Sequence, residues 1–137
     1  MTRNLILIIS CILCSTSLFS QNKVVISEKG ITKITTYEQR LDKGLDKKFV
    51  VSEISYNSIG KITEQKFTSR KGVVKEWTKF KYNSNGNEIE EQTLNPRGDV
   101  EKRVVTIYKD QLKTSREFYD SEGRLYRKKT YEYEFGK

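Results

Sequence analysis

The sequence predicts an all-β protein, an antiparallel meander of about nine strands built from β-hairpin repeats in a thin or curved sheet. The first observation is regular glycine spacing, in steps of 14, 16, 12, 14, 12 and 25 residues. The second is that a short polar residue opens six of the seven tetrapeptides that end in these glycines. The third is composition, because alanine is absent whereas Val, Ile, Thr and Tyr, which favour strands, are plentiful. The predicted turn glycines are Gly30, Gly44, Gly60, Gly72, Gly86, Gly98 and Gly123.

The N-terminal segment is typical of a secretory signal peptide. Arg3 precedes an apolar run over 5–13, small polar residues follow as far as Ser20, and Gln21 opens a charged chain. The apolar run is too short to span a bilayer as a helix. We therefore expect a signal peptide at 1–20, cut after Ser20, one domain at 21–137, and a secreted or periplasmic product with no transmembrane segment.

Cys11 offers an alternative to a soluble product. The residues at 8–11 resemble the lipobox that precedes the acylated cysteine of bacterial lipoproteins, so lipid anchoring at Cys11 stays open. Both cysteines, Cys11 and Cys14, precede the expected cut. A mature chain starting at Gln21 has no disulfide and no cysteine metal site.

The tetrapeptides that end in glycine have the chemistry of type I turns. SEKG, NSIG, NSNG, NPRG and DSEG place Ser, Asn or Asp first, and such side chains bond the backbone two residues on. Glycine in the last place supplies the positive φ of a hairpin closed through a bulge. Within the longest glycine step, 109–111 is the expected glycine-free turn. The turns delimit strands at 23–27, 31–39, 48–56, 61–68, 73–82, 87–94, 99–108, 112–119 and 124–134.

Alternation within these strands predicts which side chains share a face of the sheet. The groups are Val50, Ile54 and Tyr56; Val74, Phe80 and Tyr82; Val100, Val104, Thr106 and Tyr108; and Leu125, Tyr131 and Tyr133. Charged residues are frequent on both faces, so cross-strand Lys/Glu pairs and the long stems of Lys and Arg are expected to cover the aromatic rings.

Tyrosines add a longer period. Tyr56, Tyr82 and Tyr108 are 26 residues apart and Tyr133 follows after 25. One repeat is therefore two strands and two turns, and equivalent tyrosines should recur on every second strand and on the same face. Such repeats bury their apolar faces only by stacking on neighbours.

The segment YDSEGRL at 119–125 resembles the core of the YD repeat of RHS-type bacterial surface and secreted proteins. YNSIGKI at 56–62 and YNSNGNEI at 82–89 match that core more loosely, with Asn57 and Asn83 in place of the aspartate. The resemblance implies β-hairpin repeats in a short, free-standing relative of a secreted family. The aromatic–glycine spacing is also similar to MORN-type repeats.

The residues that most enzymes use are scarce. The chain has no histidine, the expected mature chain has no cysteine, and no glycine-rich phosphate loop precedes a helix, so we expect no cofactor, no metal and no catalysis. Glu88, Glu90 and Glu91 form an acidic cluster, although alternation puts Glu90 and Glu91 on opposite faces. Asp110 and Asp120 fit turn positions.

Aromatic residues are the remaining candidates for a binding surface, with packing within the sheet as the alternative. A net charge of +8 favours anionic partners, and the export signal argues against nucleic acid. We expect a non-catalytic binding or structural module at a bacterial envelope, whose partner is a protein or polysaccharide. A small carbohydrate-active enzyme and an immunity-like partner of a secreted toxin are alternatives. The candidate binding residues are Trp77, Phe80, Tyr82, Tyr108 and Tyr131.

Overall fold

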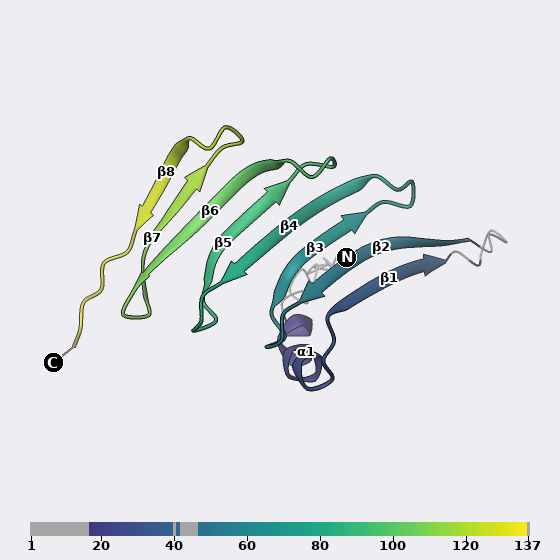
Figure 1. The fold of residues 1–137 in the computed structure, drawn as a ribbon, viewed down its shortest axis with the longest axis horizontal. Coiled ribbons are helices and arrows are strands. Elements are labelled where there is room, and N and C mark those ends of the chain that lie inside the picture. The colour runs from purple at the N-terminus through teal and green to yellow at the C-terminus, as the bar shows by residue number, and fades with distance from the viewer. Residues whose placement is uncertain (1–16, 40, 42–46, 137) are drawn as a thin grey trace, which may run out of the picture.

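The computed structural model describes residues 17–39, 41 and 47–136, with side chains described from Lys23 onwards. This part of the chain forms one helix and a single eight-stranded antiparallel sheet in the order β1 to β8 (Figure 1). The predicted all-β meander is confirmed, with eight strands. The helix is α1 (Ser17–Glu28), and the strands are β1 (Lys33–Gln39), β2 (Lys48–Tyr56), β3 (Ile62–Thr68), β4 (Val74–Tyr82), β5 (Glu88–Leu94), β6 (Val100–Lys109), β7 (Leu112–Tyr119) and β8 (Leu125–Thr130).

The strand predicted at 23–27 is wrong, because these residues belong to α1. The β-branched run from Val24 to Ile26 also favours a strand, but tertiary packing overrides that propensity. Gly30 has a φ of 63° and ends the helix, since its N–H donates to the Ser27 carbonyl at 3.1 Å and the Ile31 N–H to the Ile26 carbonyl at 2.9 Å. Gly30 is thus a helix cap instead of the predicted corner between two strands.

Five of the predicted hairpin corners share one hydrogen-bond pattern. In the turn after β2, the Gly60 N–H donates to the Asn57 carbonyl at 3.0 Å, and the Asn57 side-chain oxygen accepts from the N–H groups of Ile59 and Lys61. Gly72, Gly86, Gly98 and Gly123 have positive φ and make the same bond to the first carbonyl of their turns. The pair of bonds to the first side chain recurs at Asn83, Asn95 and Asp120, whereas the Ser69 hydroxyl accepts from Val73 alone. Gly44 and Cys11 lie outside the described residues, as do residues 1–16 of the predicted signal peptide at 1–20, whose last four residues belong to α1.

The predicted glycine-free turn is also confirmed. Asp110 and Gln111 have φ values of 51° and 66°, and Lys109 pairs directly with Leu112. Positive φ at both central residues is the geometry of a type I′ hairpin. Asp120 accepts backbone hydrogen bonds in its own turn, so both aspartates are turn residues, as predicted.

Each strand pair contains a bulge close to its turn. Where a glycine closes the turn, the unpaired residue is the third after it, as Thr63 follows Gly60 and Ile89 follows Gly86. The other unpaired residues are Val51, Lys75, Glu101, Thr114 and Tyr126. Because a bulge reverses the alternation, the first member of each predicted face group falls on the opposite face. This corrects the predictions for Val50, Val74, Val100 and Leu125.

Directly opposed residues define the two faces of the sheet. One row runs Ser55, Glu64, Lys79, Gln92, Arg103 and Tyr119, and we call its side the charged face. The next row runs Phe80, Glu91, Val104, Phe118 and Arg127 on the other side. We call that side the tyrosine face, because Tyr82 follows Phe80 at the same parity and Tyr108 follows Val104.

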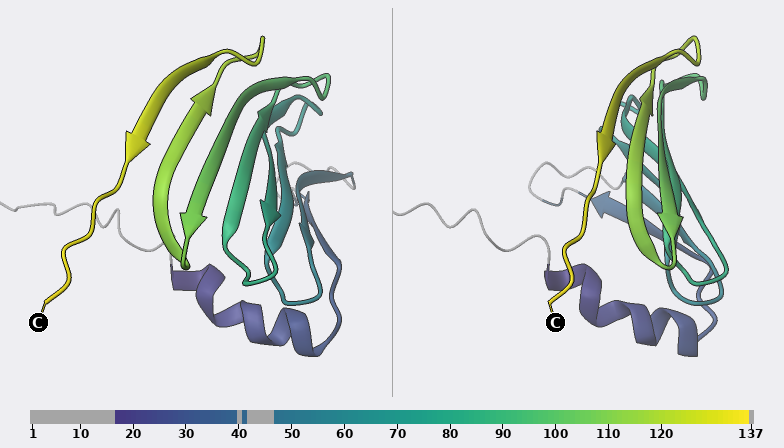
Figure 2. Two further views of the ribbon diagram at one scale, coloured as in Figure 1. Left: turned by 60° about the vertical axis from the view of Figure 1, so that its left-hand side comes forward. Right: turned by 90° about the vertical axis from the view of Figure 1, so that its left-hand side faces the viewer.

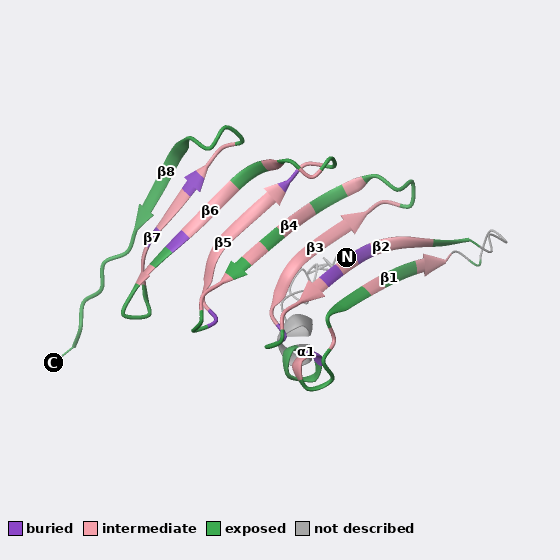
Figure 3. Cartoon of the chain, viewed as in Figure 1, coloured by how far each residue is buried: buried purple, intermediate pink, exposed green. Residues whose placement is uncertain are grey.

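The sheet is curved and twisted, and its core is thin (Figure 2). The buried apolar side chains among the described residues are Ile26, Ile54, Leu94 and Phe118, and all of β8 is exposed (Figure 3). On the charged face, cross-strand ion pairs take the place of an apolar layer, for example Lys81 with Glu90 at 2.8 Å and Lys128 with Glu117 at 2.9 Å. Cations also cover rings, as predicted, including the Arg127 guanidinium 3.8 Å from the Phe118 ring centre.

Helix α1 lies at the end of the sheet that carries the turns after β2, β4 and β6 (Figure 2). Ile26, 3% exposed, is the most buried apolar side chain described. Ser27 Oγ donates to the Ser58 carbonyl at 2.8 Å, which ties the helix to the turn after β2. Among the described residues, no helix is long and apolar enough to cross a membrane.

Candidate functional site

A row of tyrosines on the tyrosine face is held by one repeated hydrogen bond. The Tyr82 hydroxyl donates to the Ile62 carbonyl at 2.7 Å, and the Tyr108 hydroxyl donates to the Glu88 carbonyl at 3.1 Å. Tyr133 makes the equivalent bond to the Lys113 carbonyl at 2.8 Å. Each acceptor lies 20 residues before its tyrosine, at the start of the preceding odd-numbered strand. The 26-residue period of the sequence is therefore a repeated contact, which fixes the rings at one level of the sheet.

Partial burial makes the phenol groups on this face weaker acids than an exposed tyrosine. Burial, reinforced by the negative charge of Glu88, raises the pKa of Tyr82 to about 12. Burial also raises the pKa of Tyr56 and of Tyr108 above the ordinary tyrosine range. These hydroxyls therefore keep their protons to higher pH than an exposed tyrosine does, and those of Tyr82 and Tyr108 donate hydrogen bonds.

A hollow of about 380 Å³ opens on the tyrosine face beside α1. Within it, the Lys61 ammonium lies 5.0 Å from the centre of the Tyr82 ring and donates to the Gly86 carbonyl. Aromatic walls with ammonium groups at the rim suit a small group that carries negative charge and an apolar surface. The lining residues are Lys23, Gly60, Lys61, Ile62, Phe80, Tyr82 and Glu88.

Two carboxylates share the tyrosine face next to this hollow. Because Ile89 is the bulge residue of β5, Glu88 opposes Tyr82 and Glu91 opposes Phe80, so both point to that face. Burial raises the pKa of Glu88, and the charge of Glu91 raises it further. Glu88 is therefore a carboxylate that the fold makes harder to ionise.

Arg116 balances part of this negative charge. Its Nη2 lies 3.4 Å from a carboxylate oxygen of Glu91, and its charge lowers the pKa of Glu88. Its Nε is buried and has no hydrogen-bond partner among the described residues. Glu90 instead pairs with Lys81 on the charged face, so the prediction that Glu90 and Glu91 lie on opposite faces is confirmed.

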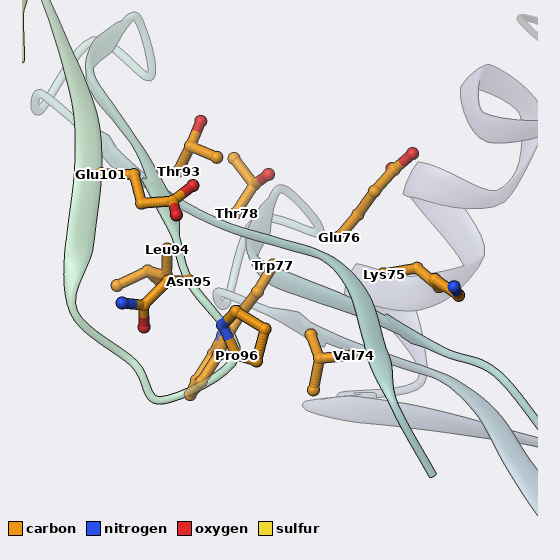
Figure 4. A pocket seen from close by; sticks show the side chains of 10 residues that line it. All are labelled: Val74, Lys75, Glu76, Trp77, Thr78, Thr93, Leu94, Asn95, Pro96 and Glu101. Atoms are coloured by element: carbon orange, nitrogen blue, oxygen red, sulfur yellow. The ribbon is translucent and has the colours of Figure 1, made fainter. Parts of the chain in front are cut away.

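Trp77 lies on the charged face, away from the tyrosines. Its Nε1 donates to Glu64 at 2.6 Å, and the Lys66 ammonium lies 4.1 Å from the centre of its ring. A hollow of about 300 Å³ borders the ring, and Figure 4 shows the side chains that line it. Those residues are Val74, Lys75, Glu76, Trp77, Thr78, Thr93, Leu94, Asn95, Pro96 and Glu101. Trp77 is thus already engaged on both its polar edge and its ring face.

The structure brings together four of the five predicted binding residues. Phe80, Tyr82, Tyr108 and Tyr131 lie on the tyrosine face, where the Lys113 ammonium is 5.6 Å from the Tyr131 ring centre, and Trp77 lies on the other. Sequence reasoning missed Lys61 and Arg116, and it noted Glu88 as part of an acidic cluster without placing it beside Tyr82. Glu88 faces Tyr82 because of the bulge at Ile89, and the sequence of a charged strand gives little indication of where such a bulge lies.

No group of three or more carboxylate or cysteine side chains suited to a metal ion occurs within the described ranges. No protein-family model matches the chain, and no curated protein matches it either.

Proposed function

We propose that the protein is a secreted, non-catalytic β-hairpin repeat module that binds an anionic polymer of the bacterial envelope through its tyrosine face. The observation that carries this proposal is the row of tyrosines with the Lys61 and Lys113 ammonium groups beside their rings. Rings offer flat apolar area to a sugar or side chain, while ammonium groups attract its negative charge.

The sequence supports the same proposal from two sides. The resemblance of YDSEGRL to the YD repeat of bacterial surface and secreted proteins suggests a structural or adhesive setting. The signal-like N-terminus suggests export. Mass spectrometry of the exported product would test export, since a chain starting at Gln21 is expected, whereas lipid on Cys11 would show a tethered product.

A binding assay on anionic and neutral glycans tests the proposed site. The variant Lys61→Glu reverses a charge at the hollow and should weaken retention on anionic glycans about tenfold, with neutral glycans unaffected. Lys71→Glu is the matched control, because Lys71 is exposed in the turn after β3. Equal effects of the two variants would mean that retention reflects net charge alone and would contradict a site on the tyrosine face.

One observation favours a carbohydrate-active enzyme as a second candidate. Glu88 and Glu91 share one face, and the pKa of Glu88 is raised, as for a general acid in glycoside hydrolysis. Loss of glycan turnover in Glu88→Gln, with glycan binding retained, would favour the enzyme over the binding module.

A further inference from the structure

We propose that the sheet extends from one copy of the chain to the next, with β1 of a second copy pairing along the free edge of β8. The two outermost strands of the sheet are β1 and β8, and no described segment pairs with the outer edge of either. The proposal concerns self-assembly and goes beyond the binding role of the tyrosine face.

Strand direction allows this pairing. The sheet has eight strands that alternate in direction, so β8 of one copy runs antiparallel to β1 of another copy placed beside it in the same orientation. Such a junction continues the meander as the junctions from β2 to β3 and from β4 to β5 do. Both edge strands also carry exposed apolar side chains, including Tyr37 at 59% and Tyr126 at 56%.

Backbone hydrogen bonds limit the registers available. The Tyr131 N–H donates to the Thr114 carbonyl, so the backbone groups of Lys128, Thr130 and Glu132 point away from β7. The Tyr56 N–H donates to the Thr32 carbonyl, so by the same alternation those of Lys33, Thr35 and Tyr37 point away from β2. An intermolecular ladder must join these two outward-facing sets.

One such register aligns complementary side chains. Opposing Thr130 to Thr35 sets Arg127 against Glu38, Lys128 against Tyr37, Lys129 against Thr36, Tyr131 against Ile34 and Glu132 against Lys33. Opposite charges, Thr–Thr and aromatic–β-branched pairs are the favourable cross-strand combinations. A register two residues further along aligns charges as well, but it relies on Tyr133 and Glu134, which lie past the last backbone bond to β7.

The same register keeps the two faces continuous. Lys128 lies on the charged face, as do Lys33 and the residues that follow it at the same parity on β1. Tyr131 and Ile34 then meet on the tyrosine face, next to Ile54, which is already buried. The tyrosine row of one copy would thus run on toward the first strands of the next.

Charge also disfavours the competing symmetric pairing. In the register centred on Lys128, an antiparallel β8–β8 contact would set Arg127, Lys128 and Lys129 against the same three cations of a second copy. Like charges directly opposite each other are destabilising, whereas the β8–β1 contact sets Arg127 against Glu38. Glu38 already contacts Arg70 within its own chain at a half-exposed site, so the new contact extends a charge network.

Proline variants at outward-facing positions test the pairing. Thr35→Pro and Thr130→Pro each remove a backbone N–H that faces away from the neighbouring strand, so the internal sheet is retained. In sedimentation velocity of the exported chain up to about 1 mM, the unmodified protein should form species larger than a dimer. Each proline variant alone should sediment as a monomer, and their equimolar mixture should form only a 1:1 dimer.

Several results would overturn the proposal. They are a monomeric wild-type protein at every concentration, self-association of either proline variant alone, or no dimer in the mixture. If a proline variant loses its sheet by circular dichroism, charge variants decide instead. Arg127→Glu should weaken association about tenfold, and adding Glu38→Arg should restore it. A double variant no better than the single one would contradict the β8–β1 contact.

Discussion

At the scale of the residue, the tyrosine hydroxyls add a repeated side-chain contact to a sheet with so little core. Each spans from an even-numbered strand, or from the segment after β8, to a carbonyl at the start of its odd-numbered neighbour, where the bulge interrupts the ladder. A ring at that point covers apolar area and satisfies a backbone acceptor at once.

Tyr82→Phe keeps the ring and removes the hydroxyl. Loss of the hydrogen bond to the Ile62 carbonyl should lower the free energy of unfolding by about 1 kcal/mol, measured by urea denaturation. Tyr126→Phe is the control, because the Tyr126 side chain is 56% exposed. Equal losses in the two variants would show that the hydroxyl of Tyr82 has no special role.

The raised pKa of Tyr82 predicts a pH dependence. An unfolded tyrosine ionises near pH 10, whereas Tyr82 in the fold ionises near 12, so the folded state holds the proton more tightly. Its contribution to stability is therefore complete below about pH 10 and is lost as the pH rises to about 12. Urea denaturation across this window should show a steeper loss for the unmodified protein than for Tyr82→Phe.

Glu88 works against stability at neutral pH. Because burial and Glu91 raise its pKa, ionisation of Glu88 costs the fold free energy that the unfolded chain does not lose. Glu88→Gln should therefore stabilise the protein at pH 7 by about half a kcal/mol, since solvent screens a partly exposed carboxylate. The gain should vanish at pH values below the ordinary glutamate pKa, and a gain that persists there would contradict the electrostatic cause.

At the scale of the element, the turns were the most predictable feature of the chain. Glycine at the fourth position of a polar tetrapeptide identified the corners at Gly60, Gly72, Gly86, Gly98 and Gly123, because positive φ leaves few other residues acceptable. The same pattern misidentified Gly30, since a helix cap also needs a left-handed glycine after polar residues. Alternation separated Glu90 from Glu91 correctly, because both follow the bulge of β5.

A bulge at each turn glycine was predicted, but the further bulges three residues later could not be foreseen, and they decided the site. A one-residue insertion leaves composition and spacing unchanged, yet it moves every residue between the turn and the bulge to the other face. For that reason Glu88 lies on the same face as Tyr82, and Val74 lies on the same face as Trp77. The contact of α1 with the turn after β2 was also missed, because the short apolar run within α1 resembles a strand.

Gly60 and Gly72 separate turn geometry from helix docking. Alanine at Gly72 meets no atom within 4 Å, so Gly72→Ala should cost only the left-handed strain, about 1–2 kcal/mol. A methyl group at Gly60 would overlap the Lys23 carbonyl oxygen of α1, so Gly60→Ala should cost more and displace the helix. Urea denaturation with far-ultraviolet circular dichroism would show both effects, and equal costs would mean that α1 does not press on this turn.

At the scale of the whole molecule, stability should come from neighbour contacts, because every strand packs mainly on the strands beside it. Deleting residues 83–108 removes one 26-residue repeat and joins Tyr82 directly to Lys109, so that Tyr82 takes the place of Tyr108 in the chain. The shortened chain should fold into a six-stranded sheet, with an m-value in urea lower by roughly a quarter. Deleting 83–94 removes a single strand and should cost more stability, because β6 would then lie beside β4 instead of β5 and the Tyr108 hydroxyl would lose its acceptor, the Glu88 carbonyl.

The position of the bulges has a consequence for how the chain tolerates change. Each hairpin has its own turn and its own bulge a few residues later, so the register of strand pairing is defined separately at every turn. A codon inserted or lost within one strand would alter what that strand shows to solvent, and the next corner would contain the disturbance. Changes in length are thereby confined to single hairpins, which leaves the surface of the other hairpins unaltered.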